Sequence, residues 1–397
     1  MSHPLIEPIS AKLAEIDSQG LQRKRLSVET PCQPHLVVNG KTVLAFNSND
    51  YLGLAAHPQV VEALREGASL YGTGSGASHL ISGHSQSHVR LEEKLASMLS
   101  PYLESVRALY FCTGYMANLG ILSALADSAQ GDITVFSETL NHASLIDGIR
   151  LSRSTVQLYP HCDTQTLEEQ LRVCKSKAKV VVTDSVFSMD GDIAPVRELL
   201  ALCEQYGAWL LVDDAHGFGI LGRTGCGILE QLDIRSTNLI YMGTLGKAAG
   251  VGGAFVAAHE TVIEWMVQRS RPYIYTTAAP PALAHALLTS LRIILSEEGN
   301  ARRAHLQELI QQFATAPIPT DWKRLPSDTA IQPIVIGSNA DVLKASASLK
   351  ELGLWVTAIR APTVPAGTAR LRITLSAAHT TQDVAQLIKA LSVGAAP

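Results

Sequence analysis

An amine, a carboxylate and an imidazole lie at the ends of two apolar segments of the chain. Lys247 closes residues 241–247, and Asp213 and His216 follow the apolar residues 209–212. A Schiff-base lysine and an anion that faces a pyridine nitrogen are the two protein groups that pyridoxal 5'-phosphate (PLP) requires. The sequence therefore predicts a PLP enzyme in which Lys247 and Asp213 are catalytic.

Lys247 has an apolar, glycine-rich neighbourhood that extends from Leu245 to Gly253. Removal from water lowers the pKa of a lysine and raises its fraction of nucleophilic amine. Glycines beside a lysine also suggest a nucleotide phosphate loop, but that motif places Ser or Thr directly after the lysine, where this chain has Ala248. The segment thus favours Schiff-base chemistry.

Gly114 and Tyr115 follow the apolar residues 109–111 and open a helical pattern. Free backbone N–H groups at a helix start, next to a glycine that allows close approach, suit a phosphate. An ordinary strand-to-helix turn is the alternative. Asp213 would keep a pyridine nitrogen protonated, although an Asp after a strand is also a common turn residue. His216 suits a hydrogen bond to the phenolic oxygen of the cofactor.

Two further side chains are candidates for contact with the cofactor. His142, in residues 140–144, suits stacking on a pyridine ring and can donate a proton, and we expect it to be catalytic. Ser188, in residues 186–191, offers a hydroxyl beyond the predicted strand 180–183. Taken alone, His142 is ambiguous, a solvated turn serine is the preferred explanation of Ser188, and a lone histidine such as His216 is more often a structural partner.

Seven short β-rich runs alternate with helical patterns, which predicts an α/β fold with a mostly parallel central sheet and helices on both faces. Ligand sites of such sheets lie beyond the strand ends, where the candidate residues fall. The predicted strands are 108–112, 133–136, 156–159, 180–183, 209–212, 239–242 and 254–257.

The remaining patterns predict three parts in the chain. Residues 1–50 form an N-terminal arm, with helical spacing over 6–26 and short strands within 31–46. Residues 51–285 form a large cofactor-binding domain, and residues 286–397 form a smaller C-terminal α/β domain. The strand and helix patterns of the smaller domain lie at 331–336, 342–352, 355–359, 371–375 and 384–391.

Composition excludes several classes of protein. The formal net charge of −4 argues against nucleic-acid binding, which usually needs excess Lys and Arg. The six cysteines form no CxxC pair, so we expect free thiols and no metal site. Because the sequence has neither a signal-peptide core nor an 18-residue apolar run, it predicts a cytoplasmic protein that does not enter a membrane.

Several segments together resemble the α-oxoamine synthases, a family of fold-type I PLP transferases. The resemblance covers nearly the whole chain and implies a decarboxylative condensation of an amino acid with an acyl thioester. Residues 355–372 are most similar to the members that use L-alanine and a pimeloyl thioester, either pimeloyl-CoA or pimeloyl-acyl-carrier protein, in biotin biosynthesis. The matching segments are 48–54, 72–76, 141–144, 186–191, 213–217 and 244–247.

The resemblance also implies roles around the cofactor and the substrate. Lys247 would be the Schiff-base lysine and the base that removes the alanine Cα proton. The other cofactor contacts would be Gly114, Tyr115, His142, Ser188, Asp213, His216 and Thr244, together with Thr277, which would reach the phosphate of a neighbouring subunit in a homodimer with its sites at the interface. The substrate contacts would be Asn49, His142, Thr363, Arg372 as the carboxylate clamp, and Arg23, for which Arg25 is an alternative.

The sequence is also compatible with other functions. One is another α-oxoamine synthase, such as 2-amino-3-ketobutyrate CoA ligase. Another is a noncatalytic protein with the same fold, although binding alone would not require Lys247, Asp213, His142 and Arg372 together. A Rossmann dehydrogenase is disfavoured because the glycines of residues 72–76 lack the GxGxxG spacing.

Overall fold

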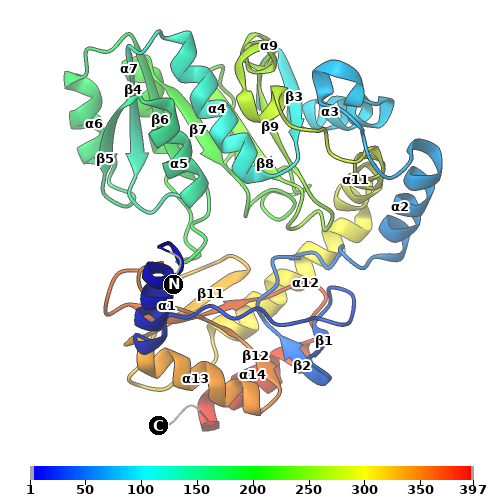
Figure 1. Ribbon diagram of the computed structural model, residues 1–397, viewed down its shortest axis with the longest axis vertical. Helices are drawn as coiled ribbons and strands as arrows, with labels where there is room; N and C mark the ends of the chain where they lie inside the picture. The colour runs from blue at the N-terminus through cyan, green and yellow to red at the C-terminus, as the bar shows by residue number, and fades with distance from the viewer. Residues whose placement is uncertain (1–3, 395–397) are drawn as a thin grey trace.

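The computed structural model describes residues 4–394, and the seven predicted strands form one sheet (Figure 1). The strand order is β3-β9-β8-β7-β6-β4-β5. Only β9 runs antiparallel to both of its neighbours, so the prediction of a mostly parallel sheet is confirmed. The strands are β3 (Val106–Phe111), β4 (Ile133–Glu138), β5 (Thr155–Tyr159), β6 (Ala178–Asp184), β7 (Trp209–Asp213), β8 (Leu239–Thr244) and β9 (Ala254–His259).

Both faces of this sheet are buried, which explains why its strands read as continuous apolar runs. In β6, Val181 belongs to one apolar cluster, while Val180 and Val182 belong to the cluster on the other face. Helices α4 (Gly114–Ser128), α5 (Ala143–Ser152), α9 (Glu260–Arg269) and α10 (Arg271–Ile274) cover the second face. Helices on the first face include α3 (Gln86–Leu99), α6 (Thr164–Val173), α7 (Val196–Tyr206) and α11 (Pro281–Ile294).

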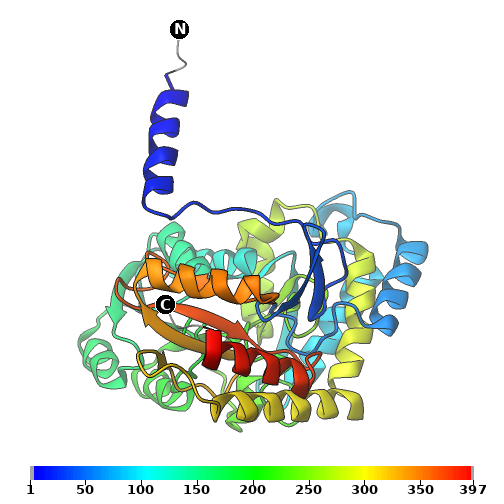
Figure 2. The same ribbon diagram turned by 90° about the horizontal axis from the view of Figure 1, so that it is seen from below.

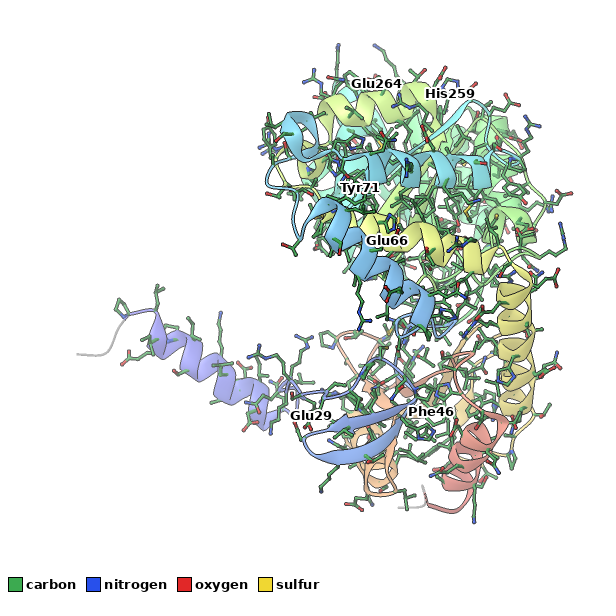
Figure 3. The ribbon with its side chains drawn as sticks, turned by 90° about the vertical axis from the view of Figure 1, so that its right-hand side faces the viewer. Glu29, Phe46, Glu66, Tyr71, His259 and Glu264 are labelled. Carbon is green, nitrogen blue, oxygen red and sulfur yellow. The ribbon has the colours of Figure 1, made fainter. Side chains whose placement is uncertain are left out.

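A second part of the molecule contains the antiparallel sheet β10-β11-β14-β13. Its strands are β10 (Lys323–Arg324), β11 (Ile331–Gly337), β13 (Thr357–Ile359) and β14 (Ala369–Thr374), and its helices are α12 (Glu297–Ala314), α13 (Asn339–Glu351) and α14 (Thr381–Gly394). Helix α2 (Pro58–Tyr71) lies beside α11 near the junction of the two parts, where Glu66 pairs with His285 at 3.1 Å (Figure 3). Two further short helices are η1 (His79–Gly83) and α8 (Ile228–Gln231).

The structure differs from the predictions at the N-terminal helix and at residues 355–359. Helix α1 (Ile6–Ser18) ends well before residue 26, because Gly20 adopts a positive φ of 64° that terminates the helix. Strands β1 (His35–Val38) and β2 (Lys41–Ala45) then form a sheet with β12 (Leu354–Trp355). The predicted strand 355–359 is therefore divided between two sheets. Figure 2 shows α1 projecting from the body, and none of its residues is buried.

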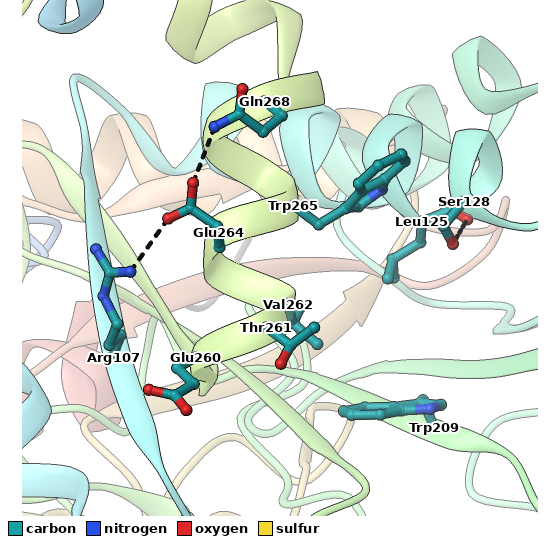
Figure 4. A pocket seen from close by; sticks show the side chains of 10 residues that line it. All are labelled: Arg107, Leu125, Ser128, Trp209, Glu260, Thr261, Val262, Glu264, Trp265 and Gln268. Carbon is teal, nitrogen blue, oxygen red and sulfur yellow. Dashed lines mark hydrogen bonds and ion pairs between the residues drawn. The ribbon is translucent and has the colours of Figure 1, made fainter.

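A cavity of about 710 Å³ lies at the amino edge of the large sheet (Figure 4). Trp209 opens β7, Arg107 lies near the start of β3, and α9 contributes Glu264 and Trp265. Glu264 accepts hydrogen bonds from Arg107 at 3.2 Å and from Gln268 at 2.9 Å. The cavity contains none of the predicted site residues, which lie at or beyond the opposite strand ends or elsewhere in the fold.

No helix among residues 4–394 combines the length and the apolar character needed to cross a membrane.

Candidate active site

Lys247 lies in the turn that connects β8 to β9, with its amine in a buried environment. The turn is closed by a hydrogen bond from the N–H of Leu245 to the carbonyl of Gly253 at 2.8 Å. Gly250 has a φ of 70°, and a Cβ there would lie 2.5 Å from the backbone of Leu54, so the packing requires glycine. Burial lowers the pKa of Lys247 to about 8, against the opposing influence of the Asp213 carboxylate. The amine is thereby more available as a nucleophile than that of an ordinary lysine.

Asp213 ends β7 and is buried. One of its carboxylate oxygens accepts a hydrogen bond from the Asn118 side chain at 2.7 Å, and the other accepts from the N–H of Ala215 at 3.0 Å. Asp184 ends the neighbouring strand directly opposite Asp213. Burial and the nearby charge of Asp213 raise the pKa of Asp184 well above its usual range. The neutral form of the Asp184 carboxyl is therefore favoured more than in an ordinary aspartate.

His142 caps the N-terminus of α5 and is connected to Asp213 through two side chains. Its Nδ1 lies 2.7 Å from Ser144 Oγ, and Asn118 Nδ2 donates both to Ser144 Oγ at 2.9 Å and to Asp213. The backbone N–H of His142 donates to Asp184 at 2.7 Å. Partial burial lowers the pKa of His142 while Asp213 opposes the shift. These contacts fix the ring at the same sheet edge as Asp213.

His216 connects Lys247 to the N-terminal segment. Its Nε2 lies 2.9 Å from Lys247 Nζ and its Nδ1 lies 2.6 Å from the hydroxyl of Tyr51. The Tyr51 hydroxyl also donates to Asn49 Oδ1 at 3.2 Å. Burial lowers the pKa of His216 well below its usual value, and the nearby charge of Lys247 acts in the same direction. The imidazole is therefore neutral.

Arg372 brings the C-terminal sheet into contact with this site. Its Nε donates to the carbonyl of Ser188 at 2.6 Å, and its Nη2 donates to Asn49 Oδ1 at 3.3 Å. Arg370, two residues earlier on β14, pairs with Asp190 at 2.6 Å. Two arginines on the same face of one strand thus hold the loop that carries Ser188, whose own hydroxyl is half-buried.

The start of α4 lies close to Thr244 at the end of β8. A Cβ on Gly114 would lie 3.9 Å from Thr244 Oγ1, and Thr113 caps the helix through the N–H of Met116 at 3.2 Å. Within residues 4–394, no acceptor is found for the N–H groups of Gly114 and Tyr115, as is usual in a first helical turn. The Tyr115 hydroxyl instead donates to Asp147, so at this point only the backbone N–H of Tyr115 is available to an anion.

Three of the predicted residues lie apart from this group. Thr277 is exposed, bridges Ser78, and accepts from Cys112 at 3.5 Å near the start of α4. Arg23 and Thr363 are both exposed and line one groove of about 450 Å³, which Arg360 also lines. Arg25 is not among the residues that line this groove.

Four residues near Lys247 and Asp213 were not singled out from the sequence: Tyr51, Asn118, Ser144 and Asp184. Asn118 had a usable signal, because it follows Gly114 by four residues and so lies on the same face of α4. Tyr51 and Ser144 lay within matched segments, but nothing local distinguished them from core or cap residues. Asp184 is distinguished by its place opposite Asp213, which only the strand register reveals.

Comparisons with known proteins agree with this geometry. The family model described as aminotransferase class I and II matches residues 41–391. The chain is 64% identical over 387 residues to a protein named 8-amino-7-oxononanoate synthase from Janthinobacterium sp. (strain Marseille), and the match covers 98% of each chain.

Two solved structures are similar over most of their length. A structure of SPT with PLP has a TM-score of 0.87 and 28% identity, covering 98% of this chain and 97% of that one. The crystal structure of 8-amino-7-oxononanoate synthase from Francisella tularensis has a TM-score of 0.72 and 30% identity, covering 88% of this chain and 96% of that one. The chain therefore belongs to the aminotransferase class I and II family and, within it, to the group of proteins named 8-amino-7-oxononanoate synthase.

Proposed function

We propose that this protein is a PLP-dependent acyltransferase that condenses L-alanine with a pimeloyl thioester. The products are 8-amino-7-oxononanoate, CO2 and the free thiol, and the reaction belongs to biotin biosynthesis. The names of the relatives support this activity. The observation that carries it is the presence of a half-buried, low-pKa amine, Lys247, and the buried carboxylate of Asp213 at one sheet edge.

The residues at this edge fit PLP. Asn118 Oδ1 is buried without a hydrogen-bond partner among the described residues, beside the carboxylate that would face the pyridine nitrogen. The N–H groups of Gly114 and Tyr115, with Thr244 nearby, suit the phosphate. His142, Ser188 and His216 would make the remaining contacts. When bound, PLP supplies an electron sink for the carbanion that forms at the amino-acid Cα.

The residues of this chain then have separate tasks. The Lys247 amine accepts the Cα proton of alanine and later returns a proton to the product. Arg372 holds the alanine carboxylate, with Asn49 beside it, because a guanidinium matches a carboxylate in two parallel hydrogen bonds. His142 donates a proton to the oxygen that becomes negative when the thioester is attacked.

The acyl chain would extend toward the groove lined by Arg23 and Thr363. Arg360 lines the same groove, so two guanidinium groups are available to the free carboxylate of a pimeloyl chain. This charge supports a dicarboxylic monothioester over a plain fatty acyl thioester. Pimeloyl-CoA and pimeloyl-acyl-carrier protein share this acyl group, and either would serve as the donor.

We also infer a homodimer that works in the cytoplasm, with Thr277 reaching the phosphate in the neighbouring subunit. Helix α1 supports association because it exposes an apolar face that includes Ile6, Ile9 and Leu13. An exposed apolar face of this kind commonly marks a protein interface. Sedimentation of the holoenzyme tests the oligomeric state.

Product analysis tests the proposed function. Purified protein with PLP, L-alanine and a pimeloyl thioester is expected to form a product with the mass of 8-amino-7-oxononanoate, with equal release of CO2. Parallel reactions with glycine and acetyl-CoA test for 2-amino-3-ketobutyrate CoA ligase. Faster turnover of that second pair would overturn the proposal.

The pKa of Lys247 predicts how the apoprotein takes up PLP. With a pKa of about 8, roughly one tenth of the amine is neutral at pH 7, far more than for an ordinary lysine. The rate of PLP capture should therefore rise with pH and level off above about pH 8, because the neutral amine is the reacting form. Stopped-flow absorbance measures this rate. A rate that continues to rise through pH 10 would show that the amine behaves as if exposed.

A further inference from the structure

A continuous line of hydrogen bonds runs from Lys247 through His216, Tyr51 and Asn49 to Arg372. Lys247 Nζ lies 2.9 Å from His216 Nε2, and His216 Nδ1 lies 2.6 Å from the Tyr51 hydroxyl. Asn49 Oδ1 accepts from Tyr51 at 3.2 Å and from Arg372 at 3.3 Å. Tyr51 is 1% exposed and His216 is 7% exposed, so water does not replace these partners. The mechanism above assigns no task to Tyr51.

The Tyr51 hydroxyl can serve either neutral tautomer of His216. A neutral imidazole has one N–H and one acceptor nitrogen, and a hydroxyl can both donate and accept. When Lys247 is charged it donates to Nε2, so Nδ1 carries the proton and donates to Tyr51, which in turn donates to Asn49. When Nε2 carries the proton instead, the Tyr51 hydroxyl donates to Nδ1, and Asn49 keeps the hydrogen bond from Arg372.

We propose that Tyr51 is a positioning residue whose hydroxyl lets His216 exchange its ring proton between Nδ1 and Nε2. The inference rests on the proposed function, in which Nε2–H faces the phenolic oxygen of the cofactor. Lys247 is half-buried, so its ammonium can lose a proton to solvent and become a nucleophile. The neutral amine no longer has to donate to Nε2, and the ring proton can then lie on Nε2. The imidazole carries one proton in both states, while the Tyr51 hydroxyl changes from accepting the Nδ1–H to donating to Nδ1.

Among the described residues, no other group that faces His216 can both accept a hydrogen bond from Nδ1 and donate one to it. Lys247 and Arg372 are cations that raise the cost of a doubly protonated ring, and His142 acts in the same direction. The Asn49 side chain contacts Tyr51 and Arg372, and no hydrogen bond joins it to His216 within the described residues. Phenylalanine at position 51 would keep the ring volume and leave Nδ1 without a partner in either tautomer.

The test compares Tyr51→Phe with Tyr159→Phe. Tyr159 is also 1% exposed, and its hydroxyl contacts the carbonyl of Val182 at 3.5 Å, away from His216. Loss of one buried hydrogen-bond partner should weaken PLP binding by roughly 5- to 150-fold in Tyr51→Phe. Tyr159→Phe should keep the PLP affinity of the natural protein. Equal affinity in all three proteins would overturn the proposal.

A second readout needs no cofactor. ¹⁵N NMR of the apoprotein should show His216 with Nδ1 protonated and Nε2 unprotonated, and His216→Gln identifies the signals. In Tyr51→Phe this tautomer should be lost, whereas in Tyr159→Phe it should persist. An unchanged tautomer in Tyr51→Phe means that the hydroxyl is only structural and overturns the inference. If the natural protein binds no PLP, the proposed function fails, while the NMR comparison still decides the role of Tyr51.

Discussion

Replacing Lys247 with alanine is expected to abolish both turnover and the visible absorbance that bound PLP gives the protein. The same amine would attach the cofactor and move the Cα proton, so its loss removes two functions at once. We expect kcat to fall by more than about 10⁴-fold, since proton transfer alone contributes up to about that factor. Absorbance after incubation with PLP and a product assay by mass spectrometry measure the two effects.

Two control variants separate nucleophilicity from charge. Lys247→Arg keeps a cation beside Asp213 but has no neutral amine at any working pH, so it should be as inactive as the alanine variant. Lys177→Ala removes an exposed lysine before β6 and should leave turnover and absorbance unchanged. Substantial activity in Lys247→Arg would show that charge, and not the amine, is the essential property at this position.

The positions of the strands could be predicted from the sequence because both faces of the sheet are buried. Residues such as Val180, Val181 and Val182 must all be apolar, so each strand forms an uninterrupted run that ends where polar residues begin. The same rule placed Asp213, His216 and Lys247 beyond strand ends. Their nearness in space follows from the adjacency of β7 and β8, which alternation alone could only suggest.

The contacts that complete the site could not be predicted in this way, because they join residues far apart in the chain. Tyr51 forms a hydrogen bond with His216, which lies 165 residues away in the sequence, and Asn118 forms one with Asp213, which lies 95 residues away. A buried tyrosine and a helical asparagine have no local pattern that distinguishes these partners from core residues. Only the resemblance of residues 48–54 to a family motif indicated that the N-terminal segment contributes to the site.

Two secondary-structure predictions were wrong, one for a local reason and one because of strand pairing. Apolar spacing continued past Ser18, but Gly20 ends α1 by adopting a positive φ. The run 355–359 contains two strands, because residues 354–355 pair with β2 while residues 357–359 pair with β14. The second case shows that β-propensity identifies a strand without identifying its partner.

The carboxylate of Asp213 offers the other large effect, through the variant Asp213→Asn. The amide keeps the shape and can still accept from Ala215, so the fold should persist, but it cannot stabilise a proton on the pyridine nitrogen. Removing one partner of a buried ion pair costs about 3–5 kcal/mol, which corresponds to a fall in kcat of about 10²- to 10⁴-fold. Steady-state kinetics with saturating PLP measures this fall in kcat.

Asp214→Asn is the matched control for this prediction, because the two carboxylates are adjacent but have different partners. Asp214 accepts from Ser185, from Tyr241 at 2.6 Å and from the N–H of Ile228 at 2.8 Å, and burial raises its pKa to about 7. It therefore supports the loop after β7. We expect Asp214→Asn to unfold at a lower urea concentration than the natural protein and largely to keep its kcat. The opposite pattern, in which Asp213→Asn loses stability and keeps its rate, would assign the two roles in reverse and leave the pyridine nitrogen without its proposed anion.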